Sequence, residues 1–346
     1  MPNNSSAPLK SLNSFGVDVH ARRVIAAHTV TDLLMFAQQA VENIEPLLVL
    51  GGGSNVLFLE NYTGNILLNR ITGIIVKENN DAWHLHVGAG EEWHHLVHMC
   101  LEKRMPGLEN LALIPGSVGS APIQNIGAYG VDLQKFCEYV EVLQLATGER
   151  RWLSSVECQF GYRDSIFKHD LREGHVIVAV GLRLPKAWKP VLNYGDLRSL
   201  NACKVTPWQI YHAVCKMRRT TLPDLALHGN AGSFFKNPII HESTAKPLLN
   251  RYPDIPHYPQ LGGGVKLAAG CLIDTCGLKG YRQGGAIVHH KQALVLVNAN
   301  NATGEDIIAL ARHIHHRVAE RFSVWLEPEV RIIGANGEVD GIRAMI

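Results

Sequence analysis

Two glycine-rich segments constrain this chain more than any other feature of its sequence. The first, LLVLGGGSNVLFL over residues 47–59, places three glycines between two apolar runs. Glycine adopts backbone angles that side chains with a Cβ avoid, so successive N–H groups of such a loop can converge on an anion. The loop lacks the Lys-Ser/Thr pair and the following helix of common phosphate loops. It predicts a turn between two strands, and taken alone it fits an ordinary glycine hairpin as well as a binding loop.

The second segment, IPGSVGSAPIQNIGAYG over residues 114–130, favours a binding loop over a simple hairpin. It is rich in glycine, serine and amide side chains and contains no charged residue. A surface loop normally carries charge, whereas this composition suits close approach to a large, flat, hydrogen-bonding ligand. A tightly packed buried loop is the alternative, and its backbone groups would all need partners. Two such loops in one half of the chain favour a cofactor site.

Composition restricts the partners of the chain. Its 346 residues include 33 Lys and Arg against 31 Asp and Glu, and the cations form no cluster, so extended nucleic-acid binding is not expected. Seven scattered cysteines without a Cys-x-x-Cys pair indicate reduced thiols. The first residues lack the apolar core of a signal peptide, and no apolar run is long enough to span a bilayer. We expect a cytoplasmic protein without a membrane partner.

Hydrophobic periodicity predicts a mixed α+β fold rather than a regularly alternating one. Helices are expected over 29–42, with Thr29 and Asp32 as a capping box, 91–104, 206–219, 265–276 and 305–322. Strands are expected on both sides of the first glycine loop and over 83–87, 139–145, 175–184, 286–297 and 324–334.

Three short segments carry candidate catalytic side chains. In GYRDS, Arg163 can clamp a carboxylate or an enolate, although an Arg163–Asp164 surface pair is the simpler interpretation. In GNAGSFFKNP, Ser233 lacks a nucleophile elbow, so it suits a proton donor or a loop-stabilising serine. In LEPEVR, a regular strand would place Glu327, Glu329 and Arg331 on one face, either as a catalytic group or as a solvated edge.

Histidine spacing does not predict a metal site. His94 and His98 have the i, i+4 spacing of a zinc pair, but no third ligand is evident, and we expect a solvated helix surface there. The group at His313, His315 and His316 lacks a further ligand in the same way.

Taken together, the segments LGGGSNVLF, IPGSVGSAPIQNIGAYG, GYRDSIFK, GNAGSFFKNP and LEPEVR resemble the UDP-N-acetylenolpyruvoylglucosamine reductase family, in family order, from about residue 15 to 335. The resemblance implies an FAD-binding domain of the vanillyl-alcohol-oxidase type in two subdomains over 15–187. A connecting segment over 188–205 and a smaller α+β substrate-binding domain over 206–323 follow, and a C-terminal strand in 324–346 returns to the first domain.

The same resemblance implies the reaction. The family uses NADPH to reduce FAD and then reduces the enolpyruvyl ether of UDP-N-acetylglucosamine to UDP-N-acetylmuramate, a step of peptidoglycan precursor synthesis. NADPH and the sugar nucleotide are expected to use one site in turn, and the enzyme is expected to be a monomer. An FAD-dependent oxidase or dehydrogenase of a small hydroxy acid, and a nucleotide-sugar-binding protein without catalysis, are the alternatives.

Residue roles follow from the matched motifs. Arg163 matches the electrostatic clamp for the enolate-like intermediate, Ser233 the proton donor and Glu329 the catalytic glutamate. Tyr194 matches the mobile-loop tyrosine of the family's longer type, which also has serine at the position of Ser233. Substrate contacts are implied for Tyr129, Tyr194, Asn237 and Gln292. Cofactor contacts are implied for Gly51, Gly52, Gly53, Ser54, Asn55, Pro115, Gly116, Ser117, Gly119, Ser120, Gln124, Asn125 and Gly127.

One position departs from the family pattern. Thr221 precedes Leu222-Pro223-Asp224, where the family usually has a lysine that meets the substrate pyrophosphate. Arg218 or Arg219 could supply the charge, but a shift of two or three residues along a helix end points a side chain elsewhere. The departure predicts weaker binding of the sugar nucleotide, with the chemistry retained.

Overall fold

The structure is a computed structural model that describes residues 6–260 and 262–346. It divides the chain into two compact units. The central unit comprises Arg23–Gly53 and Gly64–Thr220, and the C-terminal unit comprises Met1–Arg22, Ser54–Thr63 and Thr221–Ile346. The units are described separately below.

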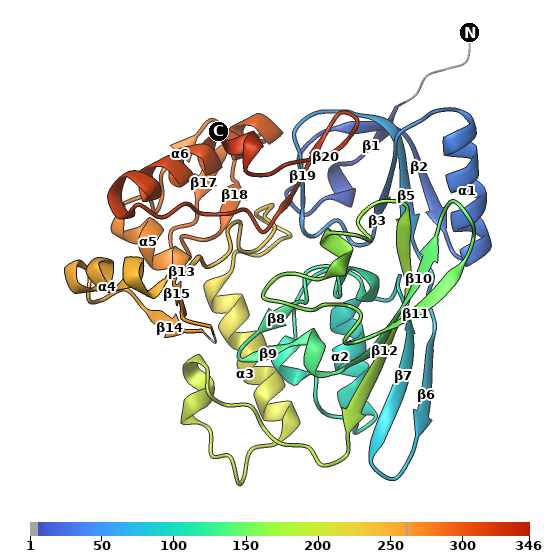
Figure 1. The fold of residues 1–346 in the computed structure, drawn as a ribbon, viewed down its shortest axis with the longest axis horizontal. Helices are drawn as coiled ribbons and strands as arrows, with labels where there is room; N and C mark the ends of the chain where they lie inside the picture. The colour runs from blue at the N-terminus through green and yellow to red at the C-terminus, as the bar shows by residue number, and fades with distance from the viewer. Residues whose placement is uncertain (1–5, 261) are drawn as a thin grey trace. The chain divides into compact units, whose positions relative to one another are not determined.

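A five-stranded antiparallel sheet organises the central unit (Figure 1). Its strand order is β11 (Arg150–Ser154), β10 (Cys137–Gln144), β12 (His175–Pro185), β7 (Ala82–Gly88) and β6 (Ile74–Glu78). Helices α2 (Trp93–Glu102) and α3 (Pro207–Thr221) share one hydrophobic core with β7, β10 and β12. The second glycine-rich segment supplies Val118, Ala121 and Ile126 to the same core, which fixes that loop against the sheet.

A second, smaller core of the central unit lies under α1 (Val30–Glu42). Thr29 and Asp32 form the predicted capping box at the start of this helix. Leu33 of α1 packs with Leu67 of β5 (Tyr62–Asn69) and with Val178 of β12. Strand β5 pairs in parallel with β3 (Leu47–Leu50). The boundary between the two units falls within β5 and within β2 (His20–Ala27).

The first glycine loop is not a hairpin. Strand β3 before the loop pairs with β5, whereas β4 (Val56–Phe58) after it pairs in parallel with β19 (Arg331–Gly334). Since the two flanking strands belong to different sheets, the glycine-hairpin interpretation is wrong. The loop turns the chain from one sheet into another.

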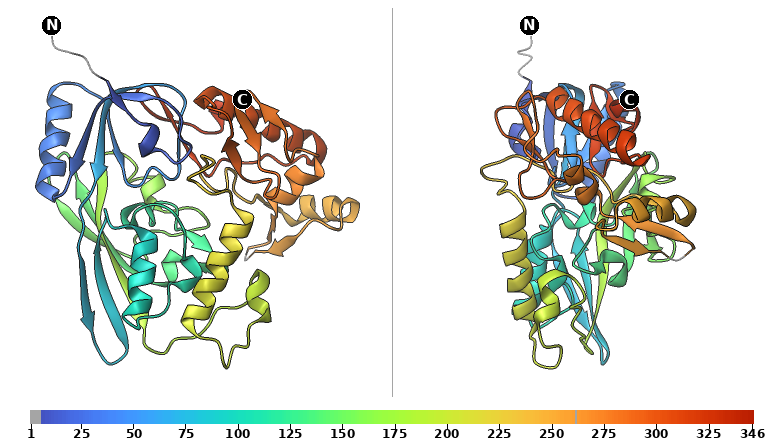
Figure 2. Two further views of the ribbon diagram at one scale, coloured as in Figure 1. Left: turned by 180° about the vertical axis from the view of Figure 1, so that it is seen from behind. Right: turned by 90° about the vertical axis from the view of Figure 1, so that its left-hand side faces the viewer.

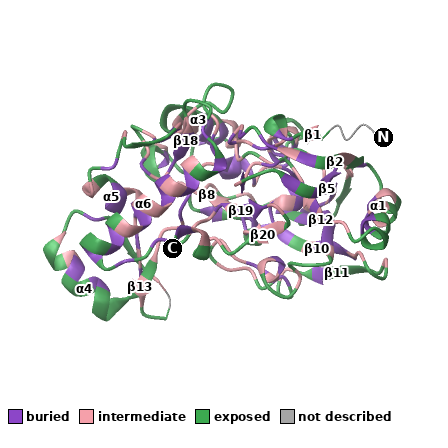
Figure 3. Cartoon of the chain, turned by 90° about the horizontal axis from the view of Figure 1, so that it is seen from above, coloured by how far each residue is buried: buried purple, intermediate pink, exposed green. Residues whose placement is uncertain are grey.

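The described residues of the C-terminal unit form short strands, short 3₁₀ turns and the α-helices α4 (Glu242–Arg251), α5 (Ala269–Thr275) and α6 (Gly304–Phe322) (Figure 2). Its longest helix, α6, begins with a capping box of Thr303 and Asp306, and its buried residues recur along the helix between half-buried and exposed ones (Figure 3). Helices α4 and α5 precede it. One sheet of this unit contains β13 (Ile239–His241), β14 (His257–Pro259) and β15 (Gly264–Leu267). Another contains β16 (Arg282–Gln283), β17 (Ala286–Val288) and β18 (Leu296–Asn298). Strand β20 (Gly337–Val339) lies beside β19, and β1 (Ala7–Pro8) lies beside β2.

Three predicted elements differ from the structure. The expected strand over 324–334 is regular only from Arg331, because Pro328 has no N–H to donate. The expected strand over 286–297 is two short strands joined by a turn. The expected helix over 265–276 begins at Ala269, because the residues before it form β15. The unit that contains the large sheet also contains α3 as far as Thr220. Within residues 6–260 and 262–346, no helix is long and apolar enough to cross a membrane.

Candidate active site

The two glycine-rich segments of the central unit pack backbone against backbone. A Cβ added at Gly52 would lie 2.9 Å from Cα of Gly116, and one added at Gly51 would collide with the Ser117 hydroxyl. Glycine is therefore required here for close approach as well as for conformation. Gly53 and Gly116 also have positive φ, 61° and 113°, in the region that disfavours a Cβ.

This packing leaves donor groups for an anion. Among the described residues, no backbone carbonyl accepts a hydrogen bond from the N–H of Gly52 or Gly53. Ser117 is buried, and its carbonyl accepts a hydrogen bond of 2.7 Å from the Ser120 hydroxyl. Gly119 packs so closely on Ala89 that a Cβ would overlap it. A rigid, uncharged cradle of small residues fits the pyrophosphate and flat ring system of FAD.

The second segment continues into residues whose side chains hold the loop together. Asn125 is buried, with φ of 43°, and its Nδ2 donates to the Gly161 carbonyl at 3.0 Å. Its Oδ1 accepts a hydrogen bond of 2.9 Å from the Gln134 amide. Pro115 and Gln124, also predicted cofactor residues, are exposed and half-buried. The Asn125 side chain thus links the glycine-rich loop to the segment that carries Arg163.

The Arg163 guanidinium contacts this loop and lies over the ring of its neighbour Tyr162, 5.6 Å from the ring centroid. Its Nη2 donates to the Gly127 carbonyl at 2.8 Å, and its backbone is left-handed, with φ of 54°. Asp164 instead contacts the ring of His169, with Nε2 2.9 Å from each carboxylate oxygen. The Arg163–Asp164 surface pair favoured by local sequence is therefore wrong. The carbonyl that accepts from the Arg163 guanidinium belongs to a residue 36 positions away in the chain.

Aromatic side chains and a second arginine are close to Arg163. The rings of Tyr129 and Tyr194 meet edge to face with centroids 5.5 Å apart. Burial lowers the pKa of Arg218, on the last turn of α3, and the charge of Arg163 acts in the same direction. Burial raises the pKa of Tyr129, while the charge of Arg218 acts to lower it. These residues form an aromatic and cationic group within the central unit.

The segments that carry Ser233 and Glu329 meet in the C-terminal unit. The backbone N–H of Glu329 donates to the Phe234 carbonyl at 2.7 Å, and Phe235 and Pro328 form an antiparallel bridge. Ser233 itself forms a bridge with Val295, before β18. Glu327 and Glu329 do not lie in the expected regular strand. Individual backbone hydrogen bonds hold this segment instead. Lys236 donates its amide to the Glu327 carbonyl at 2.9 Å.

Asn55, from the first glycine loop, fastens the same segment. Its Nδ2 donates to the Glu329 carbonyl at 3.1 Å, and its own carbonyl accepts from the Arg331 amide at 3.1 Å. The carbonyl of Ser54 accepts a hydrogen bond of 3.2 Å from the Ser14 hydroxyl. Asn55, predicted as a cofactor contact, therefore also positions the glutamate.

Two predicted substrate residues meet at the first turn of α5. Oδ1 of Asn237 accepts a hydrogen bond of 2.9 Å from the Ala269 amide. A Cβ added at Gly270 would lie 3.0 Å from Oε1 of Gln292. The sequence-predicted residues thus form two groups. Arg163, Tyr129, Tyr194 and most cradle residues lie in the central unit, and Ser233, Glu329, Asn55, Asn237 and Gln292 lie in the C-terminal unit.

Known proteins resemble this chain over nearly its full length. It is 58% identical over 337 residues to the UDP-N-acetylenolpyruvoylglucosamine reductases of Shigella sonnei (strain Ss046) and Escherichia coli (strain K12). Each alignment covers 97% of this chain and 98% of the relative. The chain belongs to the UDP-N-acetylenolpyruvoylglucosamine reductase family.

Domain models and a solved structure agree with this membership. Residues 21–154 match an FAD-binding domain, and residues 224–333 match the C-terminal domain of UDP-N-acetylenolpyruvoylglucosamine reductase. The crystal structure of the reductase from Thermus caldophilus matches with a TM-score of 0.63 at 26% identity, covering 94% of this chain and 96% of that one. The predicted α+β fold with an FAD-binding domain is confirmed.

Thr221, where the resemblance implies a lysine, is exposed and ends α3. Arg218 is half-buried, and its Nε is buried and has no hydrogen-bond partner among the described residues. The ionisable groups whose charges act on the pKa of Arg218 are those of Tyr129, Cys215 and Arg163. From the sequence, Arg218 is expected only as a substitute for the lysine. Its proximity to Tyr129 depends on how α3 packs, which no local pattern shows.

The histidines considered for metal have other roles in this reductase-family chain. His94 accepts a hydrogen bond of 3.0 Å from the Leu113 amide, and its ring stacks on Tyr211 of α3 with centroids 5.7 Å apart. His98 contacts Trp208 and Tyr211 edge to face. The expected solvated surface is therefore wrong for this face of α2. Searched over the described residues, the structure contains no cluster of three or more His, Cys, Asp or Glu that could hold a metal ion.

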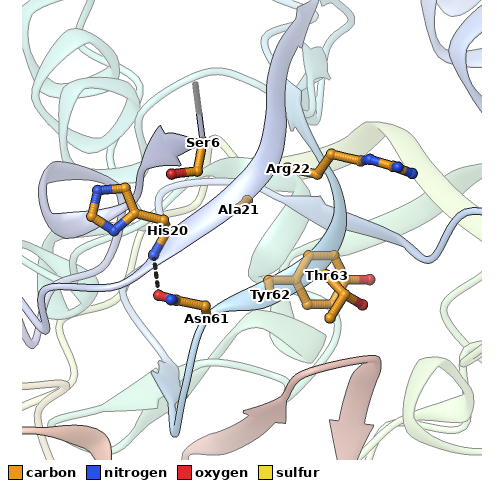
Figure 4. A pocket seen from close by; sticks show the side chains of 7 residues that line it. All are labelled: Ser6, His20, Ala21, Arg22, Asn61, Tyr62 and Thr63. Atoms are coloured by element: carbon orange, nitrogen blue, oxygen red, sulfur yellow. Dashed lines mark hydrogen bonds between the residues drawn. The ribbon is translucent and has the colours of Figure 1, made fainter. Parts of the chain in front are cut away.

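A pocket of about 250 Å³ in the C-terminal unit contains none of the predicted site residues. It is lined by Ser6, His20, Ala21, Arg22, Asn61, Tyr62 and Thr63 (Figure 4). A hydrogen bond of 2.9 Å from the His20 amide to Asn61 Oδ1 crosses it. Burial raises the pKa of the Tyr62 hydroxyl to about 12.

Proposed function

We propose that this protein reduces the enolpyruvyl ether of UDP-N-acetylglucosamine to UDP-N-acetylmuramate, with FAD as cofactor and NADPH as the reductant. The observation that carries the proposal is the 58% identity over 97% of the chain to reductases named for this substrate. The glycine cradle supports FAD as the cofactor, because the closest contacts between its two loops leave no room for a side chain. No observation favours the alternative of a hydroxy-acid oxidase.

The reaction requires a site that stabilises negative charge on the substrate. FAD, when bound, supplies the hydride chemistry between NADPH and the alkene. Hydride addition at the terminal alkene carbon leaves carbanion character beside the substrate carboxylate. Arg163 is proposed to clamp this charge with its planar guanidinium, which forms paired hydrogen bonds to carboxylates. Its hydrogen bond to the Gly127 carbonyl holds the guanidinium in place without neutralising it.

Protonation completes the reaction. Ser233 is proposed to donate the proton to the substrate α-carbon; a serine hydroxyl is a weak acid, but the carbanion is a strong base. Glu329 is proposed to act beside the substrate carboxylate through hydrogen bonding. The 2.7 Å bond between the Glu329 amide and the Phe234 carbonyl supports a joint role, because it keeps the two segments in register.

The remaining predicted residues are assigned to the sugar nucleotide. Tyr129, Tyr194, Asn237 and Gln292 are proposed to contact it, and NADPH is proposed to occupy the same site before it. Tyr194 is half exposed at 51%, which suits a side chain that closes over a ligand. The cofactor contacts are proposed for the thirteen predicted residues of the two glycine-rich segments.

We further propose that the enzyme acts in the cytoplasm as a monomer, without membrane or nucleic-acid partners. Seven free cysteines support a reducing compartment. A net charge of +2 without clustered cations supports small-molecule substrates rather than nucleic acid.

A coupled assay tests the proposed reaction. The purified protein, loaded with FAD, is mixed with NADPH and the enolpyruvyl sugar nucleotide, and NADPH consumption and product mass are measured. The proposal expects consumption that depends on the sugar nucleotide and a product heavier by two hydrogen atoms. UDP-N-acetylglucosamine, which lacks the alkene, is the control. Equal NADPH consumption with both compounds, or an unreduced sugar nucleotide, would overturn the proposal.

A further inference from the structure

Arg163 has a backbone conformation that its own side chain disfavours. Its φ of 54° lies in the left-handed region, where a Cβ crowds the following carbonyl group. The residue closes a tight turn in which the Gly161 amide donates to the Asp164 carbonyl at 2.9 Å. Such a conformation persists only when neighbouring contacts hold it.

Lys168 provides such a contact at the backbone of Arg163. Its Nζ donates to the Arg163 carbonyl at 3.0 Å, in a half-buried position. At the other end of the same residue, Nη2 donates to Gly127. Arg163 is thus held at its main chain by Lys168 and at its guanidinium by the glycine-rich loop.

The turn that carries Lys168 is itself hydrogen-bonded to the glycine-rich loop. Lys168 ends a single 3₁₀ turn, Ile166–Lys168, which Ser165 caps by accepting from the Phe167 amide. The buried Ser165 hydroxyl donates to the Ile123 carbonyl at 2.7 Å. The loop that holds the guanidinium at Gly127 therefore also anchors, through Ile123, the turn that carries Lys168. Two fixed points on one loop define where the Arg163 side chain can lie.

We propose that Lys168 is a positioning residue for Arg163: by holding the carbonyl of Arg163 it keeps that residue left-handed and directs the guanidinium to the place where substrate charge develops. This inference rests on the proposed role of Arg163 in the reductase reaction. The proposal assigns Lys168 no contact with the substrate, and it expects the effect of Lys168 on the reaction to pass through Arg163.

A double-mutant cycle tests this dependence. Lys168→Met, Arg163→Ala and the double variant are prepared as FAD-loaded full-length proteins, reduced with NADPH, and mixed anaerobically with the enolpyruvyl sugar nucleotide. The rate of substrate-driven flavin reoxidation is measured in a single turnover. We expect Lys168→Met to slow it by about tenfold or more, because small displacements of a catalytic group are costly. In the Arg163→Ala background the same substitution is expected to have no further effect.

Two variants serve as controls. Lys168→Arg retains a donor and is expected to restore most of the rate lost in Lys168→Met. Lys135→Met removes a charge from an exposed position of the same unit and is expected to leave the rate unchanged. FAD content and the unfolding transition of each variant show whether the loop still folds.

The outcomes separate the inference from the proposed function. If Arg163→Ala is slow but Lys168→Met matches the unsubstituted protein, or if Lys168→Met slows both backgrounds equally, the positioning role is overturned and the reductase proposal stands. If Arg163→Ala itself reacts at the unsubstituted rate, the proposed role of Arg163 fails.

Discussion

The backbone amide of Glu329 donates a hydrogen bond of 2.7 Å to the carbonyl of Phe234, the residue that follows Ser233. This bond joins the GNAGSFFKNP segment to the LEPEVR segment, which lie far apart in the sequence. Asn55 of the first glycine loop adds a third segment through its bond to the Glu329 carbonyl. The proposed proton donor and the proposed glutamate therefore share one hydrogen-bonded framework within the C-terminal unit.

Replacing Ser233 with alanine is expected to separate the two halves of the reaction. Loss of a positioned proton donor typically costs about 10²–10⁴-fold in rate. Flavin reduction by NADPH does not need this proton, so its rate should stay near that of the unsubstituted enzyme. Stopped-flow absorbance of each half-reaction measures both rates. Equal slowing of both half-reactions would argue against a proton-donor role.

Gly52→Ala is expected to weaken FAD binding. The new Cβ would lie 2.9 Å from the Cα of Gly116, so one of the two loops must move. Overpacking of this kind costs about 1–3 kcal/mol, which corresponds to roughly a tenfold to hundredfold weaker complex. Titration of the cofactor-free protein with FAD measures the Kd. Gly174→Ala is the control, because that glycine has positive φ but open space around it.

Thr221→Lys is expected to lower the KM for the sugar nucleotide. A lysine here would supply the charge that the resemblance implies beside the substrate pyrophosphate, and a charge-assisted hydrogen bond is worth about 1.5–3 kcal/mol. We expect KM to fall by about tenfold and kcat to change little. Thr220→Lys adds the same charge one residue earlier on α3 and should not reproduce the effect. An unchanged KM in Thr221→Lys would refute the account of this position.

The histidine pKa shifts predict acid sensitivity. Burial lowers the pKa of His315, although the hydrogen bond between its ring and the Leu326 carbonyl acts in the opposite direction. Burial also lowers the pKa of His94, His289 and His313. The unfolded chain then binds protons more readily than the folded one below about pH 6.5. The free energy of unfolding should therefore be full above that pH and fall as the pH decreases.

Urea unfolding at several pH values between about 5 and 8 measures this dependence, above the range in which most carboxylates titrate. His315→Asn should reduce the slope because it removes one of the titrating groups, whereas the same substitution at the exposed His95 serves as a control. A free energy of unfolding that rises on acidification would contradict the lowered pKa of these histidines in the folded chain.

Local sequence predicted the parts of the fold that local interactions decide. The capping box at Thr29 and the helix α6 are confirmed, since both depend on residues three or four apart. The Glu329 segment was expected to be a regular strand, but Pro328 interrupts it. The hydrogen bonds that hold it come from Phe234 and Asn55, and no pattern within LEPEVR indicates them.

The candidate site shows the same limit. Resemblance to the family selected Arg163, whereas local sequence favoured a pair with Asp164. In the structure Arg163 contacts Gly127, which is distant in sequence, and Lys168, which lies on the next turn. Neither Lys168 nor Arg218 has a sequence signal of its own, because the function of each depends on what the folded loop places beside it.

The most direct measurement of the central claim is the anaerobic absorbance spectrum of the flavin-loaded protein, first with NADPH and then with the enolpyruvyl sugar nucleotide. The account predicts that the flavin bands bleach with NADPH and return when the sugar nucleotide is added, without oxygen. A flavin that bleaches but returns only when oxygen is admitted would contradict the proposed reductase function.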